Sequence, residues 1–256
     1  MLNFRQWGDT ALKPPVVFLH GLLGELQSWN TQAKHLAEHY PVLSVDLRNH
    51  GASPHLSGMS YAQMSDDLLA LLDHLGLAKI NLIGHSMGGK VAMYFALHHP
   101  QRVEKLIIID IAPAQYPVWH MANFHALLAL PLATITSRQQ ADELLSSKIE
   151  NAFERGFLLK NLAKNSEGYY WKCNLKEILR QYLKIAAFPL LQKHYDAPAW
   201  FIKGADSNYI TETNESAIKH YFPQYQLHSI ADSGHLPHVQ QSKVFYQLIT
   251  QLLAST

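Results

Sequence analysis

Ser86 is the residue of this chain best placed to act as a nucleophile, because it lies at the centre of Gly84-His85-Ser86-Met87-Gly88. The apolar run Ile80–Ile83 precedes this pentapeptide, and the helix-like stretch Gly89–Ala96 follows it. A strand, a sharp turn and a helix in this order predict a nucleophile elbow, where glycines let helix and strand approach closely. We expect a strained Ser86 backbone that holds the hydroxyl above the sheet edge, next to the first amides of the helix.

A serine hydroxyl is a poor nucleophile at neutral pH and needs a base that a third group holds in place. Of the 16 histidines, His235 is the predicted base, because it lies in the glycine-containing loop 231–238 after the last expected strand. Its position also satisfies the order serine, acid, histidine that this architecture requires. His238 is expected to support the site or to contact the helices above it.

The oxyanion that forms during attack on a carbonyl needs two hydrogen-bond donors. One predicted donor is the backbone N–H of Met87, directly after the nucleophile. The other donor is expected from the loop His20-Gly21-Leu22-Leu23-Gly24. Within this loop, the Leu22 N–H is the predicted donor. We expect His20 to brace this loop and to take no part in proton transfer.

Length, composition and charge indicate a globular protein with a buried core. The chain has 256 residues, of which 48% are hydrophobic and 16% charged, so it can bury the core of one sizeable domain. The net charge is +1 and the sequence has no long charged runs, so no charge pattern indicates binding to nucleic acid or to an anionic membrane. No apolar stretch approaches the length of a bilayer span, and the first residues lack the layout of a signal peptide.

The single cysteine, Cys173, excludes an intrachain disulfide, and it is expected to be a small core residue. Cytoplasm is the expected compartment. His35-Leu36-Ala37-Glu38-His39 has the spacing of a zinc site, but no third ligand follows at a supporting spacing. We therefore expect neither a metal nor a cofactor.

Short apolar runs alternate with helical patterns, which predicts a mostly parallel sheet with helices on both faces. This alternation of strand and helix patterns stops between 113 and 195, where the sequence predicts helices and no strand. We expect an α/β core made of residues 1–112 and 196–256, with a helical cap, or lid, inserted at 113–195. The expected strands are 15–19, 42–46, 80–83, 106–110, 198–203 and 225–230; the expected helices are 26–39, 61–75, 138–149, 175–185 and 242–253.

Four motifs together resemble those of the α/β-hydrolases. They are His20-Gly21, the octapeptide Asp46–Ser53, the run Gly-His-Ser-Met-Gly-Gly at 84–89, and Gly234-His235. The sequence Asp-Ile-Ala-Pro at 110–113 resembles more narrowly the bacterial YbfF-type carboxylesterases. The resemblance covers the whole chain apart from the cap, and it implies an α/β-hydrolase fold with an inserted lid.

The acid of the predicted triad has two candidates. Most α/β-hydrolases place it three residues beyond the glycine that follows the strand 199–203, but that position holds the uncharged Ser207, and Asp206 is one step early. The YbfF-type resemblance implies Asp110 instead, with a serine near the later loop in the hydrogen-bond network. Both loops follow neighbouring strands at one sheet edge, so both can reach His235. Asp110 is favoured and Asp206 is the alternative, with Ser207 as a fourth member.

These residues predict a cofactor-free serine hydrolase that cleaves carboxylic esters or thioesters through an acyl-enzyme. The resemblance implies short-chain aryl esters and acyl-CoA thioesters as substrates. A C–C bond hydrolase, a cofactor-free perhydrolase and a non-catalytic binding relative of the same fold stay open as alternatives. The expected partner is a small-molecule substrate and not a nucleic acid, and the chain is expected to act as a monomer or homodimer.

Overall fold

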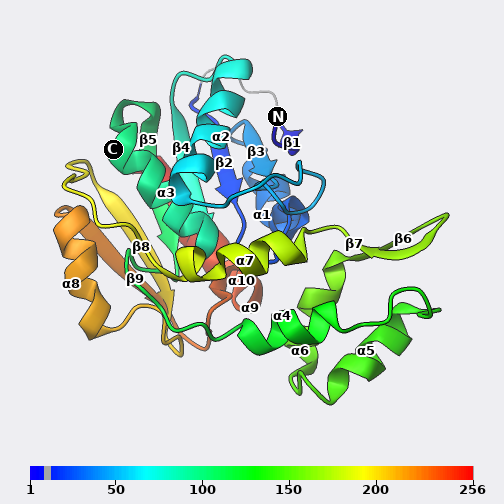
Figure 1. The fold of residues 1–256 in the computed structure, drawn as a ribbon. Coiled ribbons are helices and arrows are strands. Elements are labelled where there is room, and N and C mark those ends of the chain that lie inside the picture. Colours follow the sequence, from blue (N-terminus) through cyan, green and yellow to red (C-terminus); the bar gives the residue numbers. More distant parts are fainter. Residues whose placement is uncertain (9–12, 256) are drawn as a thin grey trace.

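In the computed structural model, which describes residues 1–8 and 13–255, seven strands form a central sheet (Figure 1). Their order across the sheet is β1-β3-β2-β4-β5-β8-β9. Neighbouring strands are parallel except for β1 and β3, which are antiparallel. The strands are β1 (Phe4–Trp7), β2 (Val16–Leu19), β3 (Val42–Val45), β4 (Ile80–His85), β5 (Val103–Ile109), β8 (Ala199–Gly204) and β9 (Tyr225–Ile230).

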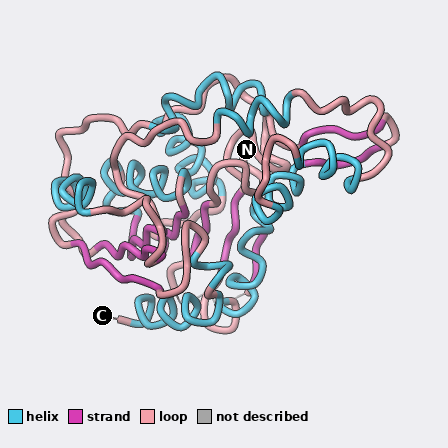
Figure 2. Tube along the Cα trace, turned by 90° about the horizontal axis from the view of Figure 1, so that it is seen from below, coloured by secondary structure: helices cyan, strands magenta, loops and turns pink. Residues whose placement is uncertain are grey.

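Helices cover both faces of this sheet, so its strands are buried on two sides (Figures 1 and 2). Side chains of β2 alternate between the layers: Val17 and Leu19 pack with one cluster, and Val16 and Phe18 with the other. The continuous apolar runs predicted this two-sided burial, and the mostly parallel α/β sheet is confirmed. One layer holds α2 (Tyr61–His74), α3 (Met87–His98) and α8 (Glu212–Tyr221); the other holds α1 (Asn30–Leu36) and α10 (Ser242–Ala254).

Several boundaries differ from the sequence-based expectation. The stretch expected as one helix over 26–39 divides into a 3-10 helix, Leu26–Trp29, and α1, which ends at Leu36. Strand β1 and helix α8 were not predicted, because β1 is a four-residue edge strand and α8 has a mostly polar surface. Residues 9–12 and 256 of the expected core ranges lie outside the described residues.

The segment between β5 and β8 contains four α-helices, a 3-10 helix (Leu159–Asn161) and a hairpin among its described residues. The expectation of no strand between 113 and 195 is wrong, because β6 and β7 pair antiparallel there. The hairpin projects from the body (Figure 2) and buries little apolar surface, so its sequence lacks the alternation that marks a strand. The elements are α4 (Met121–Leu128), α5 (Arg138–Ser146), α6 (Ala152–Leu158), β6 (Leu162–Asn165), β7 (Gly168–Trp171) and α7 (Leu175–Ala186).

Lys90, on α3, ties the two ends of this segment to the core. Its Nζ donates to the carbonyl oxygens of Ala114, Ala186 and Ala187 at 2.7, 2.9 and 3.0 Å. Burial lowers the pKa of Lys90 to about 7. Three acceptors need three N–H donors, however, and only the ammonium has three, so these bonds favour the charged form.

Among the described residues, no helix has the length and apolar character of a transmembrane span. Cys173 is buried, as expected.

Lys90→Met should lower the free energy of unfolding by about 2–5 kcal/mol, because it removes the ammonium donor from the partly buried Ala114 and Ala187 carbonyl oxygens and from the buried Ala186 carbonyl oxygen. Urea unfolding would measure this loss. Lys184→Met on the exposed face of α7 is the matched control and should change stability by less than about 0.5 kcal/mol. Equal stability of the two variants would contradict the role given to the Lys90 ammonium.

Candidate active site

Ser86 lies in a turn between β4 and α3, and its backbone has the strained conformation that the sequence predicted. Its φ and ψ are 51° and −119°, a region that residues with a side chain rarely adopt. An added Cβ on Gly84 would lie 2.3 Å from the Gly88 carbonyl oxygen, and one on Gly88 would lie 2.5 Å from the His20 carbonyl oxygen. Both positions therefore require glycine.

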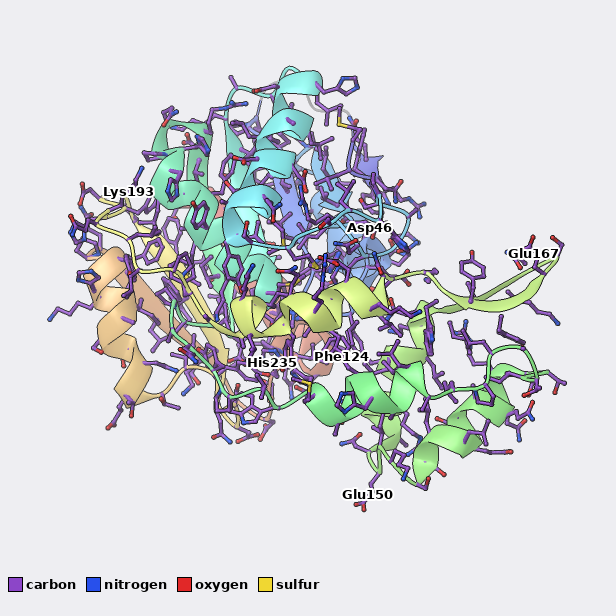
Figure 3. All side chains as sticks on the ribbon, in the orientation of Figure 1. Asp46, Phe124, Glu150, Glu167, Lys193 and His235 are labelled. Carbon is purple, nitrogen blue, oxygen red and sulfur yellow. The ribbon has the colours of Figure 1, made fainter. Side chains whose placement is uncertain are left out.

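Hydrogen bonds connect Ser86, His235 and Asp110 in one row. The Nε2 atom of His235 is 3.0 Å from Ser86 Oγ, and its Nδ1 atom is 2.8 Å from Asp110 Oδ2. Because Nδ1 faces a carboxylate, it carries the hydrogen, and Nε2 is left to accept from the serine hydroxyl. Figure 3 shows His235 at the boundary between the sheet and the helices of 113–195.

Asp110 is fully buried and directly follows β5, with a positive φ of 49°. Its carboxylate accepts hydrogen bonds from the Gly204 N–H at 3.2 Å and from the Ser207 hydroxyl, in addition to His235. These partners offset the cost of burying an ionised group. Asp206 is exposed, and among the described residues its side chain makes no hydrogen bond to His235. The structure thus brings Asp110 to His235, joins Ser207 to Asp110, and leaves Asp206 outside.

Tyr209 lies on the imidazole of His235, which the sequence analysis did not foresee. The two rings stack with centroids 3.6 Å apart and planes 14° from parallel. The Tyr209 N–H donates to Ser207 Oγ at 3.2 Å, and its hydroxyl lies 3.3 Å from His120 Nε2. The stack restricts rotation of the His235 ring. The only signal in the sequence was the position of Tyr209 two residues after Ser207.

The two predicted oxyanion donors are free to bind a ligand. Within residues 1–8 and 13–255, neither the Leu22 N–H nor the Met87 N–H has a hydrogen-bond acceptor in the protein. Both residues line the same pocket as Ser86. Met87 begins α3, where the amides of a helix attract negative charge.

Two buried histidines hold the loop that carries Leu22. His20 donates from Nδ1 to the Gly21 carbonyl oxygen at 2.8 Å, and it accepts at Nε2 from the Leu47 N–H. His50 accepts at Nε2 from the Leu23 N–H at 3.1 Å and donates from Nδ1 to the Arg48 carbonyl oxygen. Each ring needs one bare nitrogen for these bonds, so both must be neutral. Burial lowers the pKa of both, to about 3 for His50. The bracing role expected for His20 agrees with these contacts.

His85 packs against the ring of His235, and His238 packs against His85. His85 donates from Nε2 to the backbone carbonyl oxygen of His235 at 2.7 Å. His238 is buried between His85 and Trp29, and its ring stacks on the indole with centroids 4.5 Å apart. Burial lowers the pKa of His85 and of His238. The two residues therefore support the His235 loop as uncharged groups, which agrees with the supporting role expected for His238.

Three cavities surround the serine and the loop before α1. A pocket of about 40 Å³ is lined by Ser86, Leu22 and Met87. A second cavity of about 270 Å³ is lined by Ser86 and His235, and a third of about 340 Å³ reaches Trp29 and His238. Among the residues that the structure describes, no group of three His, Cys, Asp or Glu side chains is arranged to hold a metal ion.

Residues 14–241 match the model of the family described as alpha/beta hydrolase fold. The chain is 39% identical to the sn-1-specific diacylglycerol lipase ABHD11 of Mus musculus, over 96% of this chain and 83% of the relative. It is 34% identical to the Escherichia coli K12 esterase YbfF, over 93% and 92% of the two chains. A solved marine microorganism esterase superposes with a TM-score of 0.94 at 37% identity, covering 98% of each chain.

Acid should destabilise the protein through the neutral histidines. The folded-state pKa of His50 is about 3, below the ordinary value of 6.5, so the unfolded chain binds one more proton between these values. The stability that His50 contributes is complete above pH 6.5 and falls by up to about 1.4 kcal/mol per pH unit as the pH drops toward 3.

His50→Gln keeps an acceptor for the Leu23 N–H but cannot bind the extra proton. We would measure the free energy of unfolding in urea at several pH values. Between pH 6.5 and 4.5 this free energy should fall less steeply in His50→Gln than in the unmodified protein, and the difference in slope should correspond to the binding of about one proton. His39→Gln, at an exposed position, is the control and should keep the slope of the unmodified protein. An unchanged slope in His50→Gln would show that His50 does not hold the loop as a neutral ring.

Proposed function

The chain belongs to the alpha/beta hydrolase fold family and is an ester-hydrolysing enzyme, and we propose that it acts as a serine carboxylesterase through Ser86, His235 and Asp110. The observation that carries this proposal is the row of hydrogen bonds from the buried Asp110 carboxylate through His235 to the Ser86 hydroxyl. Relatives named esterase and lipase support the ester bond as the target.

In the proposed acylation, His235 Nε2 takes the hydroxyl proton as Ser86 Oγ attacks the ester carbonyl carbon. The carbonyl oxygen becomes an oxyanion that accepts hydrogen bonds from the Leu22 and Met87 N–H groups. The Asp110 carboxylate stabilises the resulting imidazolium. His235 then gives the proton to the leaving oxygen, the ester C–O bond breaks, and the alcohol departs from the acyl-enzyme.

Deacylation repeats these steps with water as the nucleophile. His235 removes a proton from water, the hydroxide attacks the acyl carbon, and the proton returns to Ser86 Oγ as the bond to the serine breaks. The products are a carboxylic acid and the free enzyme. No step needs a cofactor or metal.

Residues 113–195 are proposed to act as the cap over this site. Their contribution to the cavities supports this role: Phe153 and Phe157 on α6 line the cavity that contains Ser86 and His235. A thioester would follow the same steps with a thiol leaving group. The labelling experiment distinguishes this esterase from the alternative functions, which are a C–C bond hydrolase, a perhydrolase and a non-catalytic binding protein.

A fluorophosphonate probe should label the protein at one site per chain, and Ser86→Ala should abolish the labelling. Intact-mass spectrometry would measure both. Ser146→Ala, which removes an exposed serine hydroxyl on α5, should label like the unmodified protein. Absence of labelling in the unmodified protein would favour the non-catalytic binder, and labelling without turnover of simple esters would favour the C–C bond hydrolase or perhydrolase.

Asp110→Asn should lower kcat for a saturating ester by on the order of 10³–10⁴, because the amide cannot hold the imidazole in the required tautomer or stabilise its charge. Asp206→Asn is the matched control and should change kcat by less than about threefold. Circular dichroism would verify that both variants fold. A large loss in Asp206→Asn alone would overturn the assignment of the acid.

A further inference from the structure

Space on the two sides of the Ser86 hydroxyl is unequal. We propose that the preferred substrates are esters of a short acyl group with a long, uncharged, apolar alcohol, so that the large part of the substrate is the leaving group. This inference rests on the proposed function, since it assigns the acyl and alcohol sides of the same site.

The smaller side is assigned to the acyl group. The pocket of about 40 Å³ contains Ser86 and both proposed oxyanion donors, Leu22 and Met87, whereas His235 does not line it. A carbonyl held by these amides directs its acyl substituent into that pocket. This small volume suits a short acyl chain such as acetyl or propionyl. Trp119 of the cap lines this pocket.

The larger side is assigned to the alcohol. His235 must protonate the leaving oxygen, so the group attached to that oxygen extends into the space that His235 lines. Of the two spaces that His235 lines in the described part of the chain, the open hollow at Asp206 and Asn208 is not lined by Ser86, and only the cavity of about 270 Å³ is. Its walls are largely apolar and include Leu23, Leu158 and Leu236, which suits an alkyl chain.

The alcohol side also continues beyond this cavity. The cavity of about 340 Å³ that reaches Trp29 is its neighbour, because the two share five lining residues. The shared residues are Gly21, His85, Phe153, Phe157 and Leu236. A long alcohol can therefore pass between the two phenylalanines of α6 and the loop after β2 to reach the indole of Trp29.

Charge on the alcohol side favours a neutral leaving group. Glu154 lines the cavity next to His235, and its carboxylate accepts a hydrogen bond from the Asn123 side chain at 2.7 Å. One cation, Lys160, lies among the residues that line the distal cavity. A carboxylate near the reacting bond repels a polyanionic group such as coenzyme A, so the site suits an alcohol better than an acyl-CoA thioester.

Two isomeric esters test the assignment directly. Octyl acetate and ethyl octanoate have the same formula and differ in the side of the ester bond on which the long chain lies. We expect kcat/KM for octyl acetate to exceed that for ethyl octanoate by about tenfold or more. Octanoyl-CoA should be hydrolysed more slowly than either ester.

Variants on each side should change this ratio in the direction that the cavities require. Trp119→Ala connects the acyl pocket with the open hollow at Asp206 and Asn208, so it should raise kcat/KM for ethyl octanoate relative to octyl acetate. Gly156→Phe adds a ring where an added Cβ meets no atom within 4 Å, at the wall of the distal cavity. It should lower kcat/KM for octyl acetate relative to ethyl octanoate.

Ser28→Phe narrows the distal cavity from the opposite wall and should act in the same direction as Gly156→Phe. Gln139→Phe, at an exposed position on α5, is the matched control and should leave the ratio unchanged. An equal or reversed ratio in the unmodified protein, with Ser86 still labelled by the fluorophosphonate, would overturn this inference and leave the proposed esterase intact. Failure to hydrolyse either ester or to label Ser86 would instead overturn the proposed function.

Discussion

A buried carboxylate organises the candidate site. Asp110 has no exposed surface, and an ionised group in that position is stable only with charged or hydrogen-bonding partners. Its partners come from the ends of β8 and β9 and the loops after them: the Gly204 N–H, the Ser207 hydroxyl and the His235 ring. The need to satisfy one carboxylate therefore brings together segments far apart in the sequence, and it fixes the imidazole that contacts Ser86.

Backbone strain is concentrated around the same place. Among the described residues, five non-glycine residues have a positive φ. Four of them belong to the candidate site: Ser86 and Asp110 themselves, and Leu23 and Asp232 in the loops that carry Leu22 and His235. Such conformations persist only where surrounding contacts determine them. Here the contacts include the close packing at Gly84 and Gly88, the bond that His20 donates to the Gly21 carbonyl oxygen, and the bond that His50 accepts from the Leu23 N–H.

Much of the site could be predicted from the sequence because its signals are local. The pentapeptide around Ser86 and the loop of His235 each combine a residue type with an adjacent strand or turn, whereas Asp110 was favoured over Asp206 through the resemblance of residues 110–113 to the YbfF-type esterases. Tyr209 could not be predicted, because its stack on His235 depends on how two distant loops meet. The hairpin β6–β7 was also missed, since a strand pair that buries little surface has no apolar pattern. Cavity volumes depend on how residues 113–195 pack against the sheet and its loops, which periodicity does not reveal.

The contacts of Lys90 bear on how this fold can diversify. The Tyr116 N–H donates to the Ala186 carbonyl oxygen, and one ammonium holds Ala114 and Ala187 as well. The stretch 115–185 thus begins and ends at neighbouring points beside α3. Insertions, deletions or whole replacements between those points need not shift any strand, so evolution or an engineer could exchange the intervening module for one of another length while the machinery beneath it is retained.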